Sequence, residues 1–227
     1  MPYRYYIGNF KEIGNDPTHE SYVADNSVDC IITDPPYPKA FLHVWKDLAV
    51  FAARVLKPSG FLITYAPQYY LGKIMVDMNS VEGLAWYSQL VMTHDRHRST
   101  IFPRKEICGY KPILVFQKLN AEGKTTKPYK SFVDIIKGSG REKGLHEWQQ
   151  SQGELTPLLE TFSQPGDLIM DPFMGSGTTL AAAIINGRNA LGFDINPDVE
   201  LKVRVRLENI MIALIAMKLK VNDRLTI

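Results

Sequence analysis

The sequence predicts an α/β fold in which parallel strands alternate with helices, and three observations lead to this prediction. An apolar run at 167–170 ends at Asp171, and a glycine-rich turn and an apolar, helix-like stretch at 180–185 follow it. The next strand-like segment ends at Asp194, about twenty residues beyond the turn, as in sheets that bind nucleosides. A third buried-strand pattern, at 27–33, runs directly into a proline-rich turn.

Length and composition are those of an ordinary globular protein. The 227 residues suit one domain, 1–227, which is large enough to bury a core. The hydrophobic content of 45% and the charged content of 22% agree with this. The longest apolar stretches, such as 210–217, are shorter than a membrane span, and the first residues lack the apolar core of a signal peptide. We therefore expect a cytoplasmic protein with no membrane association.

Cysteine usage and net charge exclude little by themselves. Cys30 and Cys108 lie in apolar surroundings without the spacing of zinc ligands, so we expect buried free thiols and no metal. The net charge of +2 is too small to indicate a nucleic-acid partner through the field of the whole protein.

The first expected strand, at 4–7, is followed by Gly8, Asn9 and Phe10. A strand, a glycine and a small polar residue in this order suit an edge that contacts a nucleoside. A strand followed by a simple turn fits the same residues equally well.

The strand at 27–33 ends at Asp34, which is followed by Pro35, Pro36, Tyr37 and a further proline. Prolines do not continue a strand, so the chain leaves the sheet at its carboxyl edge, where open α/β sheets bind ligands. Because proline has no N–H, nearby carbonyls stay free as acceptors beside the Asp34 carboxylate and the Tyr37 ring. Such a cluster fits a planar heterocycle whose exocyclic amino group donates to Asp34 and a proline carbonyl while its ring stacks on Tyr37.

The glycine-rich turn at 171–179 also has the properties of a binding loop. Gly175 and Gly177 allow the backbone to approach a bound molecule, and the neighbouring hydroxyls lie at a helix N-terminus that favours an anionic group. No Lys-Ser or Lys-Thr pair follows, which excludes a P-loop. The Asp194 carboxylate is suited to ribose hydroxyls. A turn of this kind is also common for purely structural reasons.

Together, TDPPY at 33–37 and DPFMGSGTT at 171–179 resemble the motifs of the amino-group DNA methyltransferases that use S-adenosyl-L-methionine. The order, with the catalytic motif first, is that of the β class. The resemblance implies a Rossmann-like, mixed and mostly parallel seven-stranded sheet with helices on both faces. It also implies that the strands ending at Asp34 and Asp171 are adjacent at the centre of the sheet.

The resemblance extends over most of the chain. It matches an expected helix at 40–56, a central strand at 61–66, an antiparallel pair at 84–93 and 113–116, and a helix at 146–162. The last expected helix, at 197–219, is apolar on more than one face. That surplus would bury against a second copy of the chain in a homodimer, or be covered by loops of the same chain.

The resemblance assigns site residues one by one. The implied catalytic residues are Asp34, Pro35, Pro36 and Tyr37. The implied cofactor-binding residues are Asn9, Phe10, Asp34, Asp171, Pro172, Phe173, Gly175, Ser176, Gly177, Thr178, Asp194 and Ile195. Asn9 departs from the family, which usually has an Asp there to receive the adenine amino group. The segment before the helix also departs, and it leaves Gln150 or Ser151 as candidates for the methionine end.

Two basic segments are the candidates for DNA contact. The first is the loop at 95–105, and the second is a polar insertion at about 120–145, where the β class carries its target-recognition region. The candidate residues are Arg96, Arg98, Arg104, Lys105, Lys124, Lys127 and Lys130. The alternative is a pair of solvated loops.

The resemblance implies a site-specific transfer of a methyl group to the exocyclic N6 of adenine in double-stranded DNA. Cytosine-N4 enzymes more often have Ser in place of Asp34, so adenine is favoured. The alternatives are a cytosine-N4 DNA methyltransferase, an RNA or protein amide methyltransferase on the same core, and a nucleotide-binding module without catalysis.

Overall fold

A computed structural model describes residues 2–93, 99–101, 104–138 and 147–225 of the chain. Its main sheet has eight strands in the order β1-β10-β9-β2-β3-β7-β4-β8. Their bounds are β1 Tyr3–Ile7, β10 Asn189–Asp194, β9 Leu168–Asp171, β2 Val28–Thr33, β3 Leu56–Tyr65, β7 Tyr110–Lys118, β4 Leu84–Thr93 and β8 Ile135–Lys137. Strand β7 runs antiparallel to both neighbours, and the other pairs are parallel.

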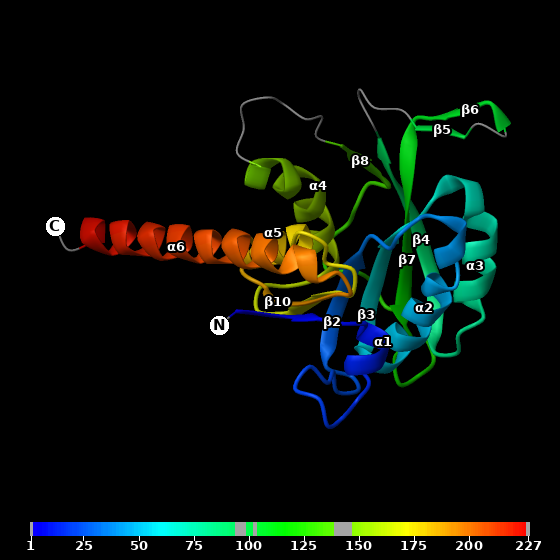
Figure 1. Ribbon diagram of the computed structural model, residues 1–227, viewed down its shortest axis with the longest axis horizontal. Helices are drawn as coiled ribbons and strands as arrows, with labels where there is room; N and C mark the ends of the chain where they lie inside the picture. The colour runs from blue at the N-terminus through cyan, green and yellow to red at the C-terminus, as the bar shows by residue number, and fades with distance from the viewer. Residues whose placement is uncertain (1, 94–98, 102–103, 139–146, 226–227) are drawn as a thin grey trace.

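Helices cover both faces of this sheet, as predicted (Figure 1). The α-helices are α1 Phe10–Ile13, α2 Val44–Val55, α3 Leu71–Asn79, α4 Glu147–Phe162, α5 Thr178–Ile185 and α6 Glu200–Leu225, and the short 3-10 helices are η1 Lys39–Phe41, η2 Gln68–Tyr70 and η4 Pro197–Val199. Because side chains alternate along a strand, β2 supplies Cys30 and Ile32 to the core beneath α4, α5 and α6. It supplies Ile31 to the core beneath α1, α2 and α3.

The predicted neighbourhood of the two motif strands is confirmed. Cys30 and Ile31 of β2 pair with Ile169 and Met170 of β9. The strands are parallel, so Asp34 and the glycine loop leave the sheet at the same edge, which we call the carboxyl edge. Because β7 runs the other way, its first residues, Tyr110 and Lys111, also lie at this edge.

Two predictions about the elements were wrong in detail. The sheet has eight strands instead of seven, because β8, within the insertion at 120–145, pairs with Val91–Thr93 of β4. The helix expected at 40–56 is divided into η1 and α2, and 57–60 belongs to β3. In addition, β5 Ser99–Ile101 and β6 Glu106–Cys108 form a separate hairpin that projects from the body (Figure 1).

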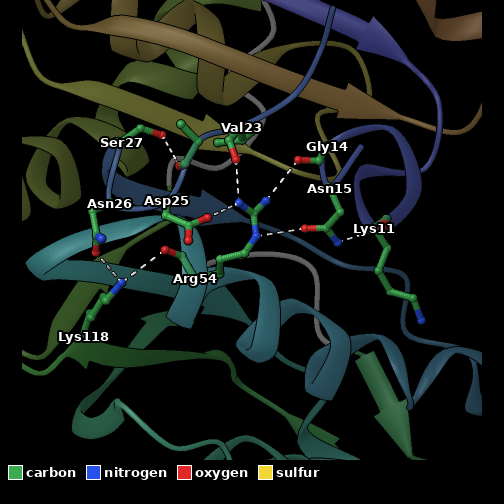
Figure 2. Close-up of polar contacts among 10 residues, drawn as sticks. Lys11, Gly14, Asn15, Val23, Asp25, Asn26, Ser27, Arg54 and Lys118 are labelled. Atoms are coloured by element: carbon green, nitrogen blue, oxygen red, sulfur yellow. Dashed lines mark hydrogen bonds and ion pairs between the residues drawn. The ribbon is translucent and has the colours of Figure 1, made fainter. Parts of the chain in front are cut away.

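The loop between α1 and β2 is fixed by Arg54 of α2 (Figure 2). The guanidinium donates to the carbonyl oxygens of Val23 and Gly14 at 2.7 and 3.1 Å. It also donates to the side chains of Asp25 and Asn15 at 2.6 and 3.0 Å. Arg54 therefore connects the carboxyl end of α1 with the part of the loop that precedes β2.

Helix α6 extends beyond the sheet at its C-terminal end (Figure 1). Several apolar side chains on it are exposed, among them Ile212 at 65% and Met217 at 63%. No helix within the described ranges is long and apolar enough to cross a membrane.

Candidate active site

The two motif loops are joined through Asp171. The Thr33 hydroxyl, at the end of β2, donates to Asp171 Oδ1 at 2.6 Å, and the Phe173 N–H donates to the same oxygen at 3.0 Å. Asp171 is only 3% exposed. Burial raises its pKa to about 6, although the hydrogen bonds from Thr33, Thr179 and Phe173 oppose the shift. Asp171 thus holds the end of β2 and the start of the glycine loop together.

The first cavity at the carboxyl edge has a volume of about 450 Å³. Seven of the predicted cofactor-binding residues line it, namely Asn9, Phe10, Asp34, Pro172, Phe173, Asp194 and Ile195. Phe41, His43 and Val44, which the sequence analysis missed, form its wall on the side of η1 and α2. The sequence feature that could have indicated these three residues is the proline run, which turns the chain back over the cavity before α2 begins.

Asp194 fixes the glycine loop while it faces this cavity. Its Oδ2 accepts a hydrogen bond from the Gly175 N–H at 2.8 Å, and its Oδ1 accepts one from the Asn196 N–H at 2.9 Å. Gly175 and Gly177 have φ of 50° and 79°, a region that favours glycine. Gly177 is the N-cap residue of α5, and Arg206 donates to the Thr178 hydroxyl at 2.6 Å. Ser176 and Gly177 line neither this cavity nor a second one that shares Asp34 and Phe173 with it.

Asn9, which lines the first cavity, also caps α1. Its side-chain oxygen accepts a hydrogen bond from the Lys11 N–H at 3.0 Å and caps α1, and its amide donates to Glu12 at 3.2 Å. One acceptor direction of the oxygen is therefore used inside the protein, which leaves the second for a ligand. Phe10 is buried and packs edge-on against the Phe173 ring, with centroids 5.3 Å apart.

A second cavity, of about 500 Å³, lies on the other side of Asp34. It is lined by Asp34, Tyr65, Met92, Lys111, Glu154, Leu155, Asp171, Phe173, Met174, Gly175, Thr178 and Thr179. Asp34 and Phe173 line both cavities, so the predicted catalytic carboxylate lies where the two meet. Gln150 and Ser151 belong to α4, one turn or less before Glu154, and their side chains lie outside the described part of the chain.

Both oxygens of the Asp34 carboxylate have partners. The Tyr37 hydroxyl donates to Oδ1 at 2.7 Å, and the Lys111 ammonium lies 2.6 Å from Oδ2. Burial and the nearby Asp34 charge raise the pKa of Tyr37, so this side chain remains a hydroxyl donor. Pro35 is buried and Pro36 lines the first cavity. The sequence analysis missed Lys111, because a single lysine at the start of a strand has no recognisable pattern.

The predicted DNA-contacting residues fall into two groups. Arg104, in the β5–β6 hairpin, lies over the Tyr69 ring with Cζ 4.6 Å from the centroid. Tyr69 belongs to η2, shortly after β3 ends at the carboxyl edge. Lys105 follows Arg104 directly, whereas Arg96 and Arg98 lie outside the described residues.

The other three lysines lie at the opposite edge of the sheet. Lys127 lines a small cavity of about 240 Å³ with Asp29 and Lys57, which lie near the amino-terminal ends of β2 and β3. Lys124 pairs with Glu122 at 3.4 Å, and Lys130 pairs with Glu160 at 3.0 Å. The structure therefore does not bring these lysines to the carboxyl edge, because the segment after β7 begins at the far end of that strand.

Two further expectations concern cysteines and metals. Cys30 and Cys108 are buried free thiols, as predicted. Within the described ranges, no cluster of three or more His, Cys, Asp or Glu side chains is arranged to hold a metal ion.

The shape and polarity of the first cavity fit an adenosine moiety. Phe10, Phe173 and Ile195 supply apolar walls for a ring, and Asp194 supplies a carboxylate for ribose hydroxyls. A Cβ added at Gly175 would meet open space, so the loop leaves room above its backbone. The apolar walls and the carboxylate of this cavity thus suit S-adenosyl-L-methionine.

Comparisons with known proteins agree with this site. The model of the DNA methylase family of N6 and N4 enzymes matches residues 28–201. YubD of Escherichia coli (strain K12) is 28% identical over 183 residues, which cover 75% of this chain and 77% of YubD. The type II methyltransferase M.HpaI of Haemophilus parainfluenzae is 25% identical over 222 residues, 82% of this chain and 69% of that enzyme.

Solved structures share the fold. The complex of M1.HpyAVI with S-adenosyl-L-methionine has a TM-score of 0.66 and 21% identity, over 90% of this chain and 99% of that one. The cytosine-N4-specific PvuII DNA methyltransferase has a TM-score of 0.71 and 14% identity, over 90% and 86% of the two chains. The chain therefore belongs to the DNA methylase family of N6 and N4 methyltransferases.

Proposed function

We propose that this DNA methyltransferase transfers its methyl group to the exocyclic N6 of adenine at a specific site in double-stranded DNA. The observation that supports this most directly is the position of Asp34. Its carboxylate lines both cavities, so it adjoins the proposed adenosine site on one side and, on the other, a second space of about 500 Å³ into which the methionine end and the target amine would both reach. An acceptor between two ligand sites suits an amine that must approach a methyl donor.

The chemistry requires the lone pair of the target nitrogen, which is delocalised into the ring. S-adenosyl-L-methionine, when bound, supplies an electrophilic methyl group on a sulfonium. Asp34 and the Pro35 carbonyl accept the two N–H bonds, which favours a tetrahedral nitrogen with its lone pair free for in-line attack. The nitrogen would gain positive charge as its new C–N bond forms and the C–S bond of the sulfonium breaks, with S-adenosylhomocysteine as the leaving group, and the Asp34 carboxylate would stabilise that charge until the extra proton passes to solvent.

The target base must leave the duplex before this contact is possible, because base pairing buries the amine. Tyr37 supplies the stacking surface for the flipped base. Its hydroxyl bond to Asp34 Oδ1, at 2.7 Å, fixes the ring relative to the carboxylate. Trp45 lies behind the ring with a centroid distance of 6.3 Å. These contacts orient the base and the acceptor as one unit.

Asp194, Asn9, Phe10, Phe173 and Ile195 are proposed to hold the adenosine end of the cofactor. Asp194 bonds the ribose hydroxyls, and the aromatic and aliphatic walls enclose the ring. Asp171, Pro172, Gly175, Ser176, Gly177 and Thr178 form the loop around the methionine end. The charge of Asp171 suits an ammonium group there.

DNA is proposed to approach at the carboxyl edge, beside the β5–β6 hairpin. Arg104 stacks on Tyr69 at this edge, and Lys105 follows it. Arg96 and Arg98 belong to the same connection in the sequence. Cations beside exposed aromatic rings suit contacts with phosphates and unstacked bases. Lys124, Lys127 and Lys130 are too far along the sheet to join this surface.

Cytosine N4 is the second candidate, since the PvuII enzyme, which is cytosine-N4-specific, shares the fold with a TM-score of 0.71. Asp34, where cytosine enzymes more often carry Ser, favours adenine. Membership of the DNA methylase family favours DNA as the substrate over RNA or a protein amide.

Nucleoside analysis separates these candidates without knowledge of the recognition sequence. Plasmid DNA from a host without DNA methyltransferases is incubated with the protein and isotopically labelled cofactor, digested to nucleosides and analysed by mass spectrometry. We expect labelled N6-methyldeoxyadenosine, and an Asp34→Ala control without label. Labelled N4-methyldeoxycytidine would establish the second candidate. Tight cofactor binding without any labelled nucleoside would overturn both.

A second copy of the chain is the further partner we propose. The exposed apolar residues of α6, including Ile212, Ile215 and Met217, suit burial against another subunit. Sedimentation equilibrium should give twice the mass of one chain, and Ile212→Glu should reduce it. A single-chain mass for the unaltered protein at micromolar concentration would contradict the homodimer.

A further inference from the structure

Lys111 contacts the Asp34 carboxylate from across the second cavity. It is the second residue of β7, whose antiparallel direction brings its first residues to the carboxyl edge. Its Nζ lies 2.6 Å from Asp34 Oδ2, and 5.0 and 4.5 Å from the ring centroids of Tyr37 and Tyr65. The lysine side chain is 23% exposed. The ammonium is therefore held between one carboxylate and two aromatic faces.

This position coincides with the contacts that the proposed reaction requires of the target base. The exocyclic amine would donate to Asp34, and its ring would stack on Tyr37. In the structure the Oδ2 atom of Asp34 is bonded to Lys111, and the same ammonium lies over the Tyr37 ring. A nitrogen donor of the protein thus occupies both contacts at once.

The positive charge of Lys111 also opposes methyl transfer. The target nitrogen becomes positive as its bond to the methyl carbon forms. A carboxylate that is already paired with an ammonium stabilises this charge less, and a second cation within a few ångströms repels it. The ion pair between Lys111 and Asp34 has to break before the reaction proceeds.

We infer that Lys111 is a positioning residue that occupies the place of the target amine in the free enzyme and gives it up when the base arrives. This inference rests on the proposed function and deepens it. Until the base arrives, the lysine takes the hydrogen bond to Asp34 Oδ2 and the face of Tyr37 that the base would use. A flexible four-carbon stem with a compact charge suits such an exchange, whereas the planar fork of arginine would hold a carboxylate more firmly.

The exchange predicts that the KM for DNA is lowest for Lys111→Met, intermediate for the unaltered protein and highest for Lys111→Arg. Steady-state methyl transfer to unmethylated plasmid DNA gives kcat and the KM for DNA of the unaltered protein, Lys111→Met and Lys111→Arg. Lys111→Met should lower KM by about two- to fivefold, the range that a partly exposed ion pair supplies. Lys111→Arg should raise KM. Cofactor affinity serves as the control and should change in neither variant.

Other roles of Lys111 predict other effects of the two variants on kcat and KM, and each of those results would overturn the inference. If Lys111 only maintains the shape of the site, Lys111→Met should lose kcat and Lys111→Arg should restore it. If Lys111 binds DNA directly, Lys111→Met should raise KM. Unchanged constants in both variants would mean that the ion pair does not compete with the base. Failure of the proposed function would differ from all of these, because the unaltered protein would then transfer no methyl group to DNA or would label deoxycytidine instead of deoxyadenosine.

A second measurement uses the unaltered protein. Lys111→Met should fold, since the Asp34 side chain is 48% exposed and water can solvate it. If Lys111→Met does not fold, NMR of the lysine side chains in the unaltered protein tests the exchange instead. The Lys111 signal is assigned by its absence from the spectrum of Lys111→Arg. Titration with deoxyadenosine and S-adenosylhomocysteine should remove the ring-current shift of Lys111. A Lys111 signal that keeps its shift at saturating nucleoside would overturn the exchange.

Discussion

Asp34 and Asp194 are carboxylates at the ends of two parallel strands, but their surroundings give them different tasks. Asp34 pairs with a hydroxyl and an ammonium and is half exposed where the two cavities meet. Asp194 accepts backbone N–H bonds from Gly175 and Asn196 and faces only the first cavity. The proposed function therefore gives Asp34 to the exchange with a substrate, whereas Asp194 also maintains the loop beside the proposed cofactor site.

The two carboxylates should therefore separate in their effects. Asp34→Ala is expected to abolish methyl transfer and to leave the cofactor Kd within about threefold, because removal of one group at the edge of the adenosine cavity is a small perturbation. Asp194→Ala should weaken cofactor binding about tenfold or more, since it removes the ribose partner and frees Gly175. Isothermal titration calorimetry with S-adenosylhomocysteine measures both. Equal weakening in the two variants would contradict separate tasks.

Asp171 is the buried carboxylate whose pKa is raised. Its folded pKa of about 6 lies above the unfolded value of 3.8, so the folded protein binds more protons than the unfolded chain between these values. The contribution of Asp171 to the free energy of unfolding should therefore decrease as pH rises from about 4 to about 6 and stay reduced above that range. Between these limits the difference corresponds to roughly 2 to 4 kcal/mol.

Asp171→Asn should remove this dependence. The amide oxygen can still accept from Thr33 and Phe173, and nothing has to ionise. Without ligand, we expect the variant to be about as stable as the unaltered protein near pH 4 and more stable by about 2 kcal/mol or more at pH 7. Urea denaturation at the two pH values measures the difference. A variant that is less stable at pH 7 would show that the carboxylate is stabilised by its donors.

At the scale of the elements, Arg54 of α2 contacts both the end of α1 and the loop that follows it. Arg54 bonds to Gly14 at the end of α1 and to Val23 before β2, and its guanidinium lies 5.3 Å from the Phe51 ring centroid. Phe51 in turn packs against Phe10, a wall of the first cavity. The contacts of Arg54 therefore extend from the loop to the proposed cofactor site.

Arg54→Met should lower the free energy of unfolding by about 2 kcal/mol, because it removes the hydrogen bonds to two carbonyl oxygens and the cation–ring interaction. It should also weaken cofactor binding, because the end of α1 loses its hydrogen bond from Arg54. Lys73→Met, which breaks an exposed pair with Asp77 in α3, is the matched control and should change stability by less than about 0.5 kcal/mol. Chemical denaturation and calorimetry measure both variants. Similar destabilisation in the two would contradict the special role of Arg54.

The sequence predicted the elements next to the two motifs better than those far from them. Strands β2, β9 and β10 were predicted because buried apolar runs there end at residues with a recognisable pattern. Strand β8 has only three residues and depends on pairing with β4, so its own sequence carries little signal. Lys111 was missed for a related reason, because its contact with Asp34 spans 77 positions of the sequence and depends on the direction of β7.

At the scale of the whole molecule, the sheet separates two groups of basic residues that the sequence could not separate. Both groups lie in polar segments of similar composition, so charge and spacing predict the same role for each. The structure divides them, because β7 begins at the carboxyl edge and ends at the opposite one. Arg104 and Lys105 precede this strand, and Lys124 and Lys130 follow it.

This division leads to a prediction about DNA binding that uses two variants of equal charge. Arg104→Gln with Lys105→Gln should reduce the slope of the logarithm of DNA affinity against the logarithm of salt concentration, by about 0.9 for each phosphate that the protein no longer neutralises. Lys124→Gln with Lys130→Gln should leave the slope unchanged, because these lysines pair with Glu122 and Glu160 at the far edge. Fluorescence anisotropy with duplex DNA at several salt concentrations measures both slopes. An equal reduction in the two variants would mean that the cations act only through the overall charge of the protein, and the proposed approach of DNA at the carboxyl edge would be wrong.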